Sequence, residues 1–291
     1  SSPFSTKYRA ETDISPELED EEASYFQSVI GVLRWAVELG RIDITCEVSM
    51  LSSFLAMPRE GHLQQVMHMF AYLETRHNSR MVFDPTYPEI DENQFKTECD
   101  WKPFYGDVTE AIPPNAPEAR GKCIVLRLHV DADHAGDTVT RRSRTGFIIS
   151  ANNASIDWYS KKQNTIESSS FGSEFVAMRT AMEKLRGLRY KLRMLGIEID
   201  GPTYAYGGNM SVVKNSSAPE STLRKKCNSI CYHAVREAVA TGELLVAHVP
   251  GVINPSDILT KPVPGGQRRE ELVGMLLYDL YDKKKGKFLR Q

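Results

Sequence analysis

The chain has 291 residues, of which 41% are hydrophobic and 25% are charged. This composition is ordinary for a globular protein, and the length suggests about two domains. The formal net charge of -2 excludes a globally basic nucleic-acid-binding protein, so contacts with nucleic acid must come from local patches. No apolar run in the sequence is long enough to span a membrane.

The five cysteines are odd in number and include no CxxC pair. This usage indicates reduced thiols and an intracellular protein of the cytoplasm or nucleus. Residues 1–20 are polar and acidic and are expected to form a loose N-terminal segment. This segment has no pattern of a signal peptide.

Residues 21–85 predict a small helical unit. Apolar residues recur at spacings of three and four over 25–37, 44–55 and 66–73. Such a period is typical of helices that pack by one face. The stripes are explained by helix–helix packing and indicate no catalytic role.

Residues 86–120 are rich in Pro, Asp, Glu and Asn and are predicted to form a linker or insertion. The pattern changes after that. The segments 123–131, 142–150 and 154–162 have the composition and alternation of strands. The short connection between the last two segments predicts an antiparallel meander.

Helices and strands alternate in the rest of the chain. Three serines at 168–170 offer N-caps to a long helix whose apolar stripe continues to Leu192. Strands are predicted at 203–207 and 244–250, and helices near 211, at 223–241 and from Asn254. A meander followed by this alternation predicts an α/β domain with a mixed sheet over 121–265. Residues 266–291 are expected to form a C-terminal helix and a basic tail.

Three carboxylates occupy notable places in these elements. Asp131 ends the first strand, Glu174 lies on the apolar stripe of the long helix, and Asp257 lies in the first turn of the last helix. Carboxylates that converge from such elements can hold the hard divalent cations used in phosphodiester hydrolysis. Each carboxylate also has an ordinary explanation, namely turn chemistry, a solvated helix position and a favourable helix start, respectively.

Six blocks resemble, in sequence and order, the RNase H domain of copia-type retrotransposon polyproteins: DADHAGD, RRSRTGF, WYSKKQNTIESSS, SEFVAM, HAVREAVATGE and NPSDILTKP. The helical stretch YFQSVIGVLRWAVELGRIDITCEVSMLSSFLAMPREGH resembles the region after the polymerase palm of the same polyproteins. The resemblance covers most of residues 20–265. It implies an RNase H-like mixed sheet with flanking helices, preceded by a thumb- or connection-like helical unit.

The resemblance also implies a ribonuclease that uses two Mg²⁺ or Mn²⁺ ions to cut the RNA strand of an RNA/DNA hybrid. Asp131, Glu174 and Asp257 match its catalytic, metal-binding carboxylates. A further carboxylate belongs to a family block like YGDNxS, and Gly208 stands in its place here. Because this change removes both a charge and a metal ligand, we expect an impaired or inactive ribonuclease. No polymerase activity is expected, because the polymerase aspartates of the family lie upstream of these blocks.

Local basic clusters are candidate contacts to nucleic acid, since hybrids are recognised mainly through shape, phosphates and 2′-hydroxyls. The candidates are Arg141, Arg142, Lys161, Lys162, Arg224, Lys225, Lys226 and Arg236. A solvated charged surface is the ordinary alternative for each cluster. The expected partners are an RNA/DNA hybrid or other nucleic acid and the rest of the retroelement polyprotein.

An alternative function is a non-catalytic module, co-opted or decayed, that binds nucleic acid or another protein. Its binding would be indifferent to metal and to the carboxylates, which distinguishes it from the ribonuclease.

Overall fold

The computed structural model describes residues 1–291 except 97, 224–225, 280, 283–286 and 289–291. The helices are α1 (Asp20–Glu38), α2 (Thr45–Leu51), α3 (Glu60–Thr75), α4 (Lys102–Tyr105), α5 (Ser170–Met194), α6 (Met210–Ser217), α7 (Ser229–Ala240) and α8 (Gln267–Gly274). The strands are β1 (Ser79–Arg80), β2 (Leu126–Asp133), β3 (Arg144–Ala151), β4 (Ala154–Lys162), β5 (Thr203–Gly207), β6 (Leu244–His248), β7 (Tyr278–Asp279), β8 (Tyr281–Asp282) and β9 (Lys287–Phe288).

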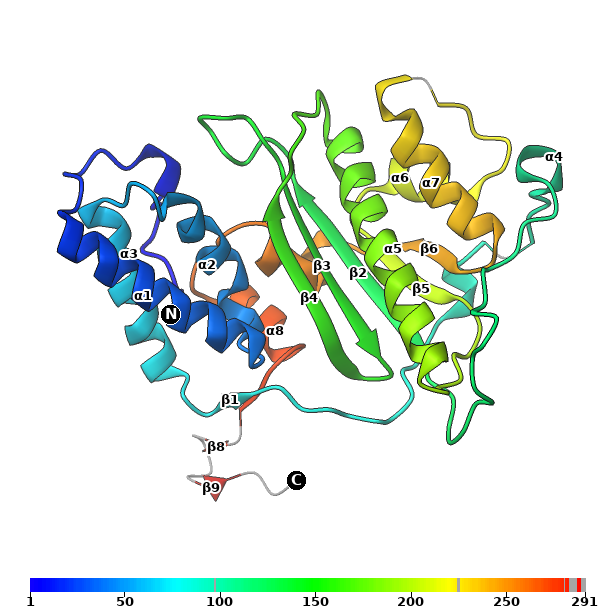
Figure 1. Ribbon diagram of the computed structural model, residues 1–291, viewed down its shortest axis with the longest axis horizontal. Coiled ribbons are helices and arrows are strands. Elements are labelled where there is room, and N and C mark those ends of the chain that lie inside the picture. Colours follow the sequence, from blue (N-terminus) through cyan, green and yellow to red (C-terminus); the bar gives the residue numbers. More distant parts are fainter. Residues whose placement is uncertain (97, 224–225, 280, 283–286, 289–291) are drawn as a thin grey trace.

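A five-stranded sheet in the order β4-β3-β2-β5-β6 forms the centre of the molecule (Figure 1). Strands β2, β3 and β4 pair antiparallel, whereas β5 pairs parallel with both β2 and β6. Asn152 adopts a φ of 53° in the turn between β3 and β4, a conformation that asparagine tolerates better than most residues. The predicted α/β class, with a mixed sheet and flanking helices, is confirmed.

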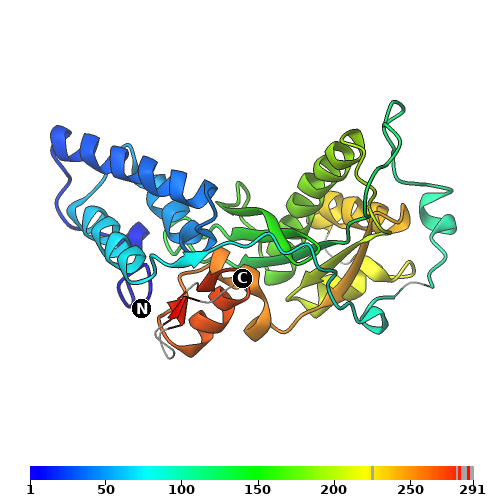
Figure 2. The same cartoon turned by 90° about the horizontal axis from the view of Figure 1, so that it is seen from below.

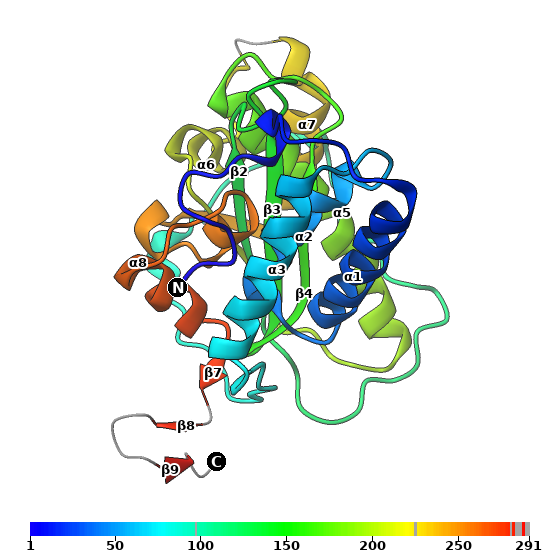
Figure 3. The ribbon, with the colours of Figure 1, turned by 90° about the vertical axis from the view of Figure 1, so that its left-hand side faces the viewer.

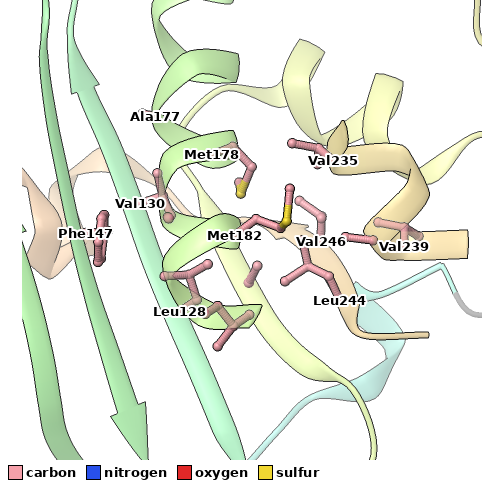
Figure 4. Close-up of a cluster of buried hydrophobic side chains, with 14 of the residues drawn as sticks. Leu128, Val130, Phe147, Ala177, Met178, Met182, Val235, Val239, Leu244 and Val246 are labelled. Atoms are coloured by element: carbon pink, nitrogen blue, oxygen red, sulfur yellow. The ribbon is translucent and has the colours of Figure 1, made fainter. Parts of the chain in front are cut away.

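One face of the sheet is covered by α5 and α7 (Figures 1 and 4). Met178 and Met182 of α5 lie in one cluster with Leu128 and Val130 of β2 and with Val246 of β6. All are almost fully buried, and burying a side chain of this size contributes about 1.5–3 kcal/mol. The apolar stripe predicted for the long helix is therefore the surface that holds α5 on the sheet.

The opposite face of β3 and β4 receives the helical unit and the C-terminal region (Figures 1 and 3). Phe147 packs on the α5 side, while its neighbour Ile148 packs with Ile42 and Leu259, because successive strand residues point to opposite faces. Trp158 of β4 also contacts the cluster formed by α1, α2 and α3. The three predicted helices are present, and the sheet lies between two helical layers.

The N-terminal segment is packed, in contrast to the loose segment expected from its polar composition. Phe4 and Ala10 are buried in the cluster of the helical unit. The Oγ of Ser15 accepts a hydrogen bond from Gly61 N at 2.8 Å, and the ring of His62 bonds to Ala10 O at 2.9 Å. Two apolar side chains and these polar contacts with the start of α3 are enough to hold the segment in place.

The segment between β1 and β2 runs from the helical unit to the far end of the molecule (Figures 1 and 2). Phe95 packs against the rings of Tyr204 and Tyr206 on β5. Glu110 binds Arg189 at 2.8 Å and Arg193 at 2.6 Å, both on α5. The predicted linker is thus attached to the sheet and to α5, and the domain boundaries near 85, 120 and 265 stay predictions.

No helix in the described part of the chain combines the length and apolar character needed to cross a membrane. The predicted basic tail includes residues 283–286, which lie outside the described residues. Before it, the predicted C-terminal helix appears as α8.

A buried ion pair joins the helical unit to α8. Arg269 Nη1 of α8 lies 3.4 Å from Glu47 Oε1 of α2, and each side chain is 1% exposed. Arg269 also donates to Asp43 O at 2.6 Å and lies over the ring of Tyr72. Burial raises the pKa of Glu47 to about 7, although Arg269 opposes this shift. Each charged side chain of the pair therefore depends on the other, because either one alone would be a buried charge without a partner.

We expect Arg269→Met to lower the free energy of unfolding by about 3–5 kcal/mol, because Glu47 loses its buried partner. The double variant Glu47→Gln/Arg269→Met should lose much less than the single variants added together. Urea unfolding at neutral pH measures these differences. Additive losses in the double variant would show that the two side chains do not act as a pair.

Candidate active site

Asp131 lies within β2, beside the point where the parallel strand β5 ends. The register pairs Val130 with Gly207, so the following residues, Asp131 and Gly208, are neighbours. A Cβ atom built on Gly208 would lie 3.7 Å from Asp131 Oδ1 and would meet no other atom within 4 Å. The position that lacks a carboxylate therefore faces Asp131 and has room for a side chain.

Asp257 reaches Asp131 through a loop that is tied to β2. The predicted last helix is only a 3₁₀ helix, Pro255–Leu259. Its cap Asn254 accepts from Ser256 N at 3.2 Å and donates to Val130 O at 3.0 Å. This bridge explains why Asp257 is buried beside β2, where its charge helps to raise the pKa of Asp131.

Glu174 approaches the same place from the start of α5. The side chain of Ser169 caps this helix by accepting from Gly172 N, as the serine run predicted. Burial raises the pKa of Glu174 to about 9, and the charges of Asp131 and Asp257 add to the shift. The structure thus brings together the three carboxylates that the sequence singled out.

Burial, followed by the crowding of like charges, sets the electrostatics of this carboxylate cluster (Asp131, Glu174 and Asp257). The pKa of Asp131 is raised to about 6, first by burial and then by the charge of Asp257. Thr260 Oγ1 opposes this shift by donating to Asp131 Oδ2 at 2.5 Å. Without a cation Glu174 retains its proton at neutral pH, because protonation relieves both desolvation and repulsion.

Lys261 supplies a positive charge from within the chain. Its Nζ lies 2.8 Å from Asp257 Oδ1, and Arg268 binds the other oxygen of Asp257. Burial lowers the pKa of Lys261, but the charges of Asp131 and Asp257 outweigh it and raise the pKa. Both oxygens of Asp257 are consequently engaged by cationic side chains.

The cluster does not fit the two-metal site that the sequence resemblance implies. Gly208 offers no ligand, and Asp257 is already paired with Lys261 and Arg268. Among the residues that the structure describes, no group of three or more His, Cys, Asp or Glu side chains is arranged to hold a metal ion. Binding of Mg²⁺ or Mn²⁺ by Asp131, Glu174 and Asp257 stays a prediction.

The predicted basic contacts fall into separate places. Arg141 and Arg142 lie exposed on the loop between β2 and β3. Lys162 is paired with Asp137 of the same loop, whereas the exposed Lys161 points to the opposite face of the sheet because it is the preceding strand residue. Arg141, Arg142 and Lys162 line one cavity, so these three can act together.

The second predicted basic group differs from the expectation. Arg224 and Lys225 lie outside the described residues, and Lys226 lines a smaller pocket beside α7. Arg236 is 2% exposed, and its guanidinium donates to several main-chain carbonyls, including Pro219 O at 2.6 Å. It also lies over the ring of Trp101. With its donors engaged inside the protein, Arg236 holds the α6–α7 connection and is not accessible to a phosphate.

Asn254 was expected as the helix cap, and the structure confirms this role. Three other important residues of the site were not singled out by sequence reasoning, namely Thr260, Lys261 and Arg268. The first two belong to the block NPSDILTKP. A lysine four residues after a carboxylate at a helix start is the signal that could have identified Lys261.

The free energy of unfolding in metal-free buffer should fall as the pH rises from about 4.5 to 9. Folding raises the pKa of Glu174 from about 4.5 to about 9, so the folded state retains a proton that the unfolded state releases. Glu174→Gln should abolish most of the fall above pH 6, whereas Glu183→Gln, an exposed change on the same helix, should leave it. Urea unfolding at several pH values tests this, and a wild-type stability that is constant from pH 6 to 9 would contradict it.

Comparisons with known proteins place the chain beside retrotransposon polyproteins. It is 26% identical over 238 residues to the Retrovirus-related Pol polyprotein from transposon RE1 of Arabidopsis thaliana, covering 82% of this chain and 14% of that protein. It is 26% identical over 252 residues to the Retrovirus-related Pol polyprotein from transposon TNT 1-94 of Nicotiana tabacum, covering 86% of this chain and 16% of that protein. The chain therefore spans only a small part of the length of these relatives.

No family model matches the chain. A solved structure of LC11-RNase H1 in complex with RNA/DNA hybrid aligns with a TM-score of 0.38 and 15% identity, covering 46% of this chain and 93% of that chain. The predicted resemblance to the Pol polyproteins of copia-type retrotransposons is confirmed over most of the chain.

Proposed function

We propose that this chain is a retrotransposon-derived RNase H-like domain that engages RNA/DNA hybrids and cuts their RNA strand poorly or not at all. The observation that carries the proposal is the position of Gly208, whose missing side chain faces Asp131 beside Glu174 and Asp257. The site has the layout of a carboxylate-based nuclease centre and lacks one of its acidic side chains.

The missing carboxylate weakens the site in two ways. A divalent cation loses one oxygen ligand, and the cluster loses one negative charge that would attract the cation. The electrostatic attraction of the remaining carboxylates for a cation is further reduced, because Lys261 and Arg268 already neutralise Asp257. Loss of a residue that only orients a ligand costs about 10–100-fold in affinity or activity, and loss of a ligand costs more.

A second candidate is the non-catalytic module, and the pairing of Asp257 with Lys261 and Arg268 favours it. A site that balances its charge internally needs no metal to stay folded. Under this second function, nucleic acid or a protein partner would bind equally well with Mg²⁺ or with a chelator. Binding would also be unchanged in Asp131→Asn.

The rest of the retroelement polyprotein is the proposed physical partner, and the cytoplasm or nucleus is the proposed location. The helical unit of residues 21–85 and the RNase H-like unit of residues 121–265 are the proposed domains. The packing of α2 on β4 supports a rigid connection between them.

We expect Gly208→Asp to raise the rate of hybrid cleavage in Mn²⁺ or Mg²⁺ by at least about 10–100-fold. The Cβ atom of the added side chain meets only Asp131 Oδ1, at 3.7 Å, so the substitution begins without a clash on the side that faces the cluster. Cleavage of the RNA strand in a labelled RNA/DNA hybrid is the measurement. A second readout is the thermal midpoint, which Mn²⁺ should raise more in Gly208→Asp than in the wild type.

Gly208→Asn is the matched control, because it has nearly the same shape as aspartate without the charge. It should leave cleavage and the effect of Mn²⁺ at the wild-type level. The double variant Gly208→Asp/Asp131→Asn should lose the gain. A wild-type protein that already cleaves as fast as Gly208→Asp, in a manner that depends on Asp131, would overturn the proposed impairment.

A further inference from the structure

A cavity of 740 Å³ lies next to the carboxylate cluster. Its walls come from the N-terminal segment, the loop between β2 and β3, and the segment after the 3₁₀ helix Pro255–Leu259. In Figure 3 the N-terminal segment starts beside α8 and rises past the sheet. Thr260 and Lys261, which contact Asp131 and Asp257, also line the cavity. The cavity and the cluster therefore share a wall.

The walls of the cavity are held together by contacts between segments far apart in the sequence. Glu11 accepts from Thr138 N at 3.3 Å and from Thr138 Oγ1 at 3.0 Å. Arg9 lies 3.5 Å from Gly136 O on the same loop. These bonds fix the N-terminal segment to the β2–β3 loop, so the cavity is a feature of the folded chain.

The lining of the cavity is predominantly basic. It includes seven Lys and Arg residues and four Asp and Glu residues. Lys162 is paired with Asp137, and Arg144 donates to Ser49 Oγ at 2.7 Å. The exposed side chains of Lys7, Arg141 and Arg142 have no hydrogen-bond or ion-pair partner among the described residues. These three cations are available to an anion from outside.

Unusual backbone conformations are concentrated around the same cavity. Four non-glycine residues of the described chain have a positive φ, and three of them line it, namely Lys7 at 66°, Ala135 at 52° and Arg141 at 57°. This conformation is uncommon for residues with a side chain. Backbone strain of this kind tends to gather at functional sites. Two of the three unpaired cations are therefore presented by strained backbone.

We infer that this cavity binds the phosphodiester backbone of a nucleic-acid strand, with Lys7, Arg141 and Arg142 contacting phosphates. Its volume is within the range of ligand sites, about 300–1,000 Å³. Because it shares Thr260 and Lys261 with the carboxylate cluster, the bound strand is the continuation of the strand placed at that cluster. The inference rests on the proposed function and adds the N-terminal segment to the nucleic-acid interface.

The test is the affinity of the full chain for a fluorescein-labelled RNA/DNA hybrid, measured by anisotropy at several salt concentrations with a chelator present. Lys7→Gln/Arg142→Gln removes two charges. Glutamine at position 7 is also an unbranched residue with a side chain, so the strain of the positive φ there is about the same as for lysine. We expect binding to weaken on the order of tenfold, and the slope of log K against log[salt] to fall by about 0.7–0.9 for each lost contact.

Arg34→Gln/Lys191→Gln is the matched control, because both residues are exposed on helices, α1 and α5, and neither lines the cavity. It should keep the wild-type affinity and salt slope. Equal thermal midpoints for both double variants exclude a folding effect.

The outcomes separate this inference from the proposed function. The cavity inference is overturned, and the proposed function stands, if the wild type binds the hybrid and both double variants keep the wild-type affinity. The same conclusion holds if both double variants lose affinity to the same extent. If the wild type does not bind the hybrid at all, both are overturned. Loss confined to Lys7→Gln/Arg142→Gln supports the cavity as the binding site.

Discussion

Repulsion among three half-buried or buried carboxylates is the constraint on which the proposed site depends. Burial is the first cause of the raised pKa values of Asp131 and Glu174. The charge of Asp257 adds to both shifts, and the charge of Asp131 adds to that of Glu174. Such a cluster persists only if something offsets the charge. Here the offset comes from protons, from the Thr260 hydroxyl and above all from Lys261. The cationic role expected of a metal ion is therefore partly taken by a side chain of the chain itself.

The scaffold fixes this cluster through main-chain geometry. The parallel pairing of β2 with β5 sets Asp131 beside Gly208. The hydrogen bond from Asn254 to Val130 O holds the loop that carries Asp257 beside β2. The core under α5 (Figure 4) holds in place the helix that carries Glu174. Because each carboxylate sits on a different element, their convergence depends on the whole sheet and not on any local motif.

Sequence reasoning succeeded where a pattern is local. Apolar residues at every second position predicted the strands, and apolar residues at spacings of three and four predicted the helices. The serine run predicted the cap of α5. It failed where a polar residue is defined by distant contacts. Arg236 looked like one more surface cation, yet its partners lie 15–21 residues away and at Trp101. The same holds for the N-terminal segment, whose contacts with α3 and the β2–β3 loop leave no periodic signal in the sequence.

The tolerance of the fold for Gly208 follows from the same electrostatics. The position has ordinary space around it and no positive φ is required there, so glycine is not needed for the backbone. Adding a carboxylate would increase the repulsion on Asp131 and Glu174 unless a cation arrived with it. In the absence of metal, the glycine therefore adds no further repulsion to the cluster. Under the proposed function, this relief comes at the expense of metal affinity. This opposition between stability and activity is common at catalytic centres. A sequence that retains the neighbouring carboxylates but not this one keeps the shape of the site and relieves part of its charge.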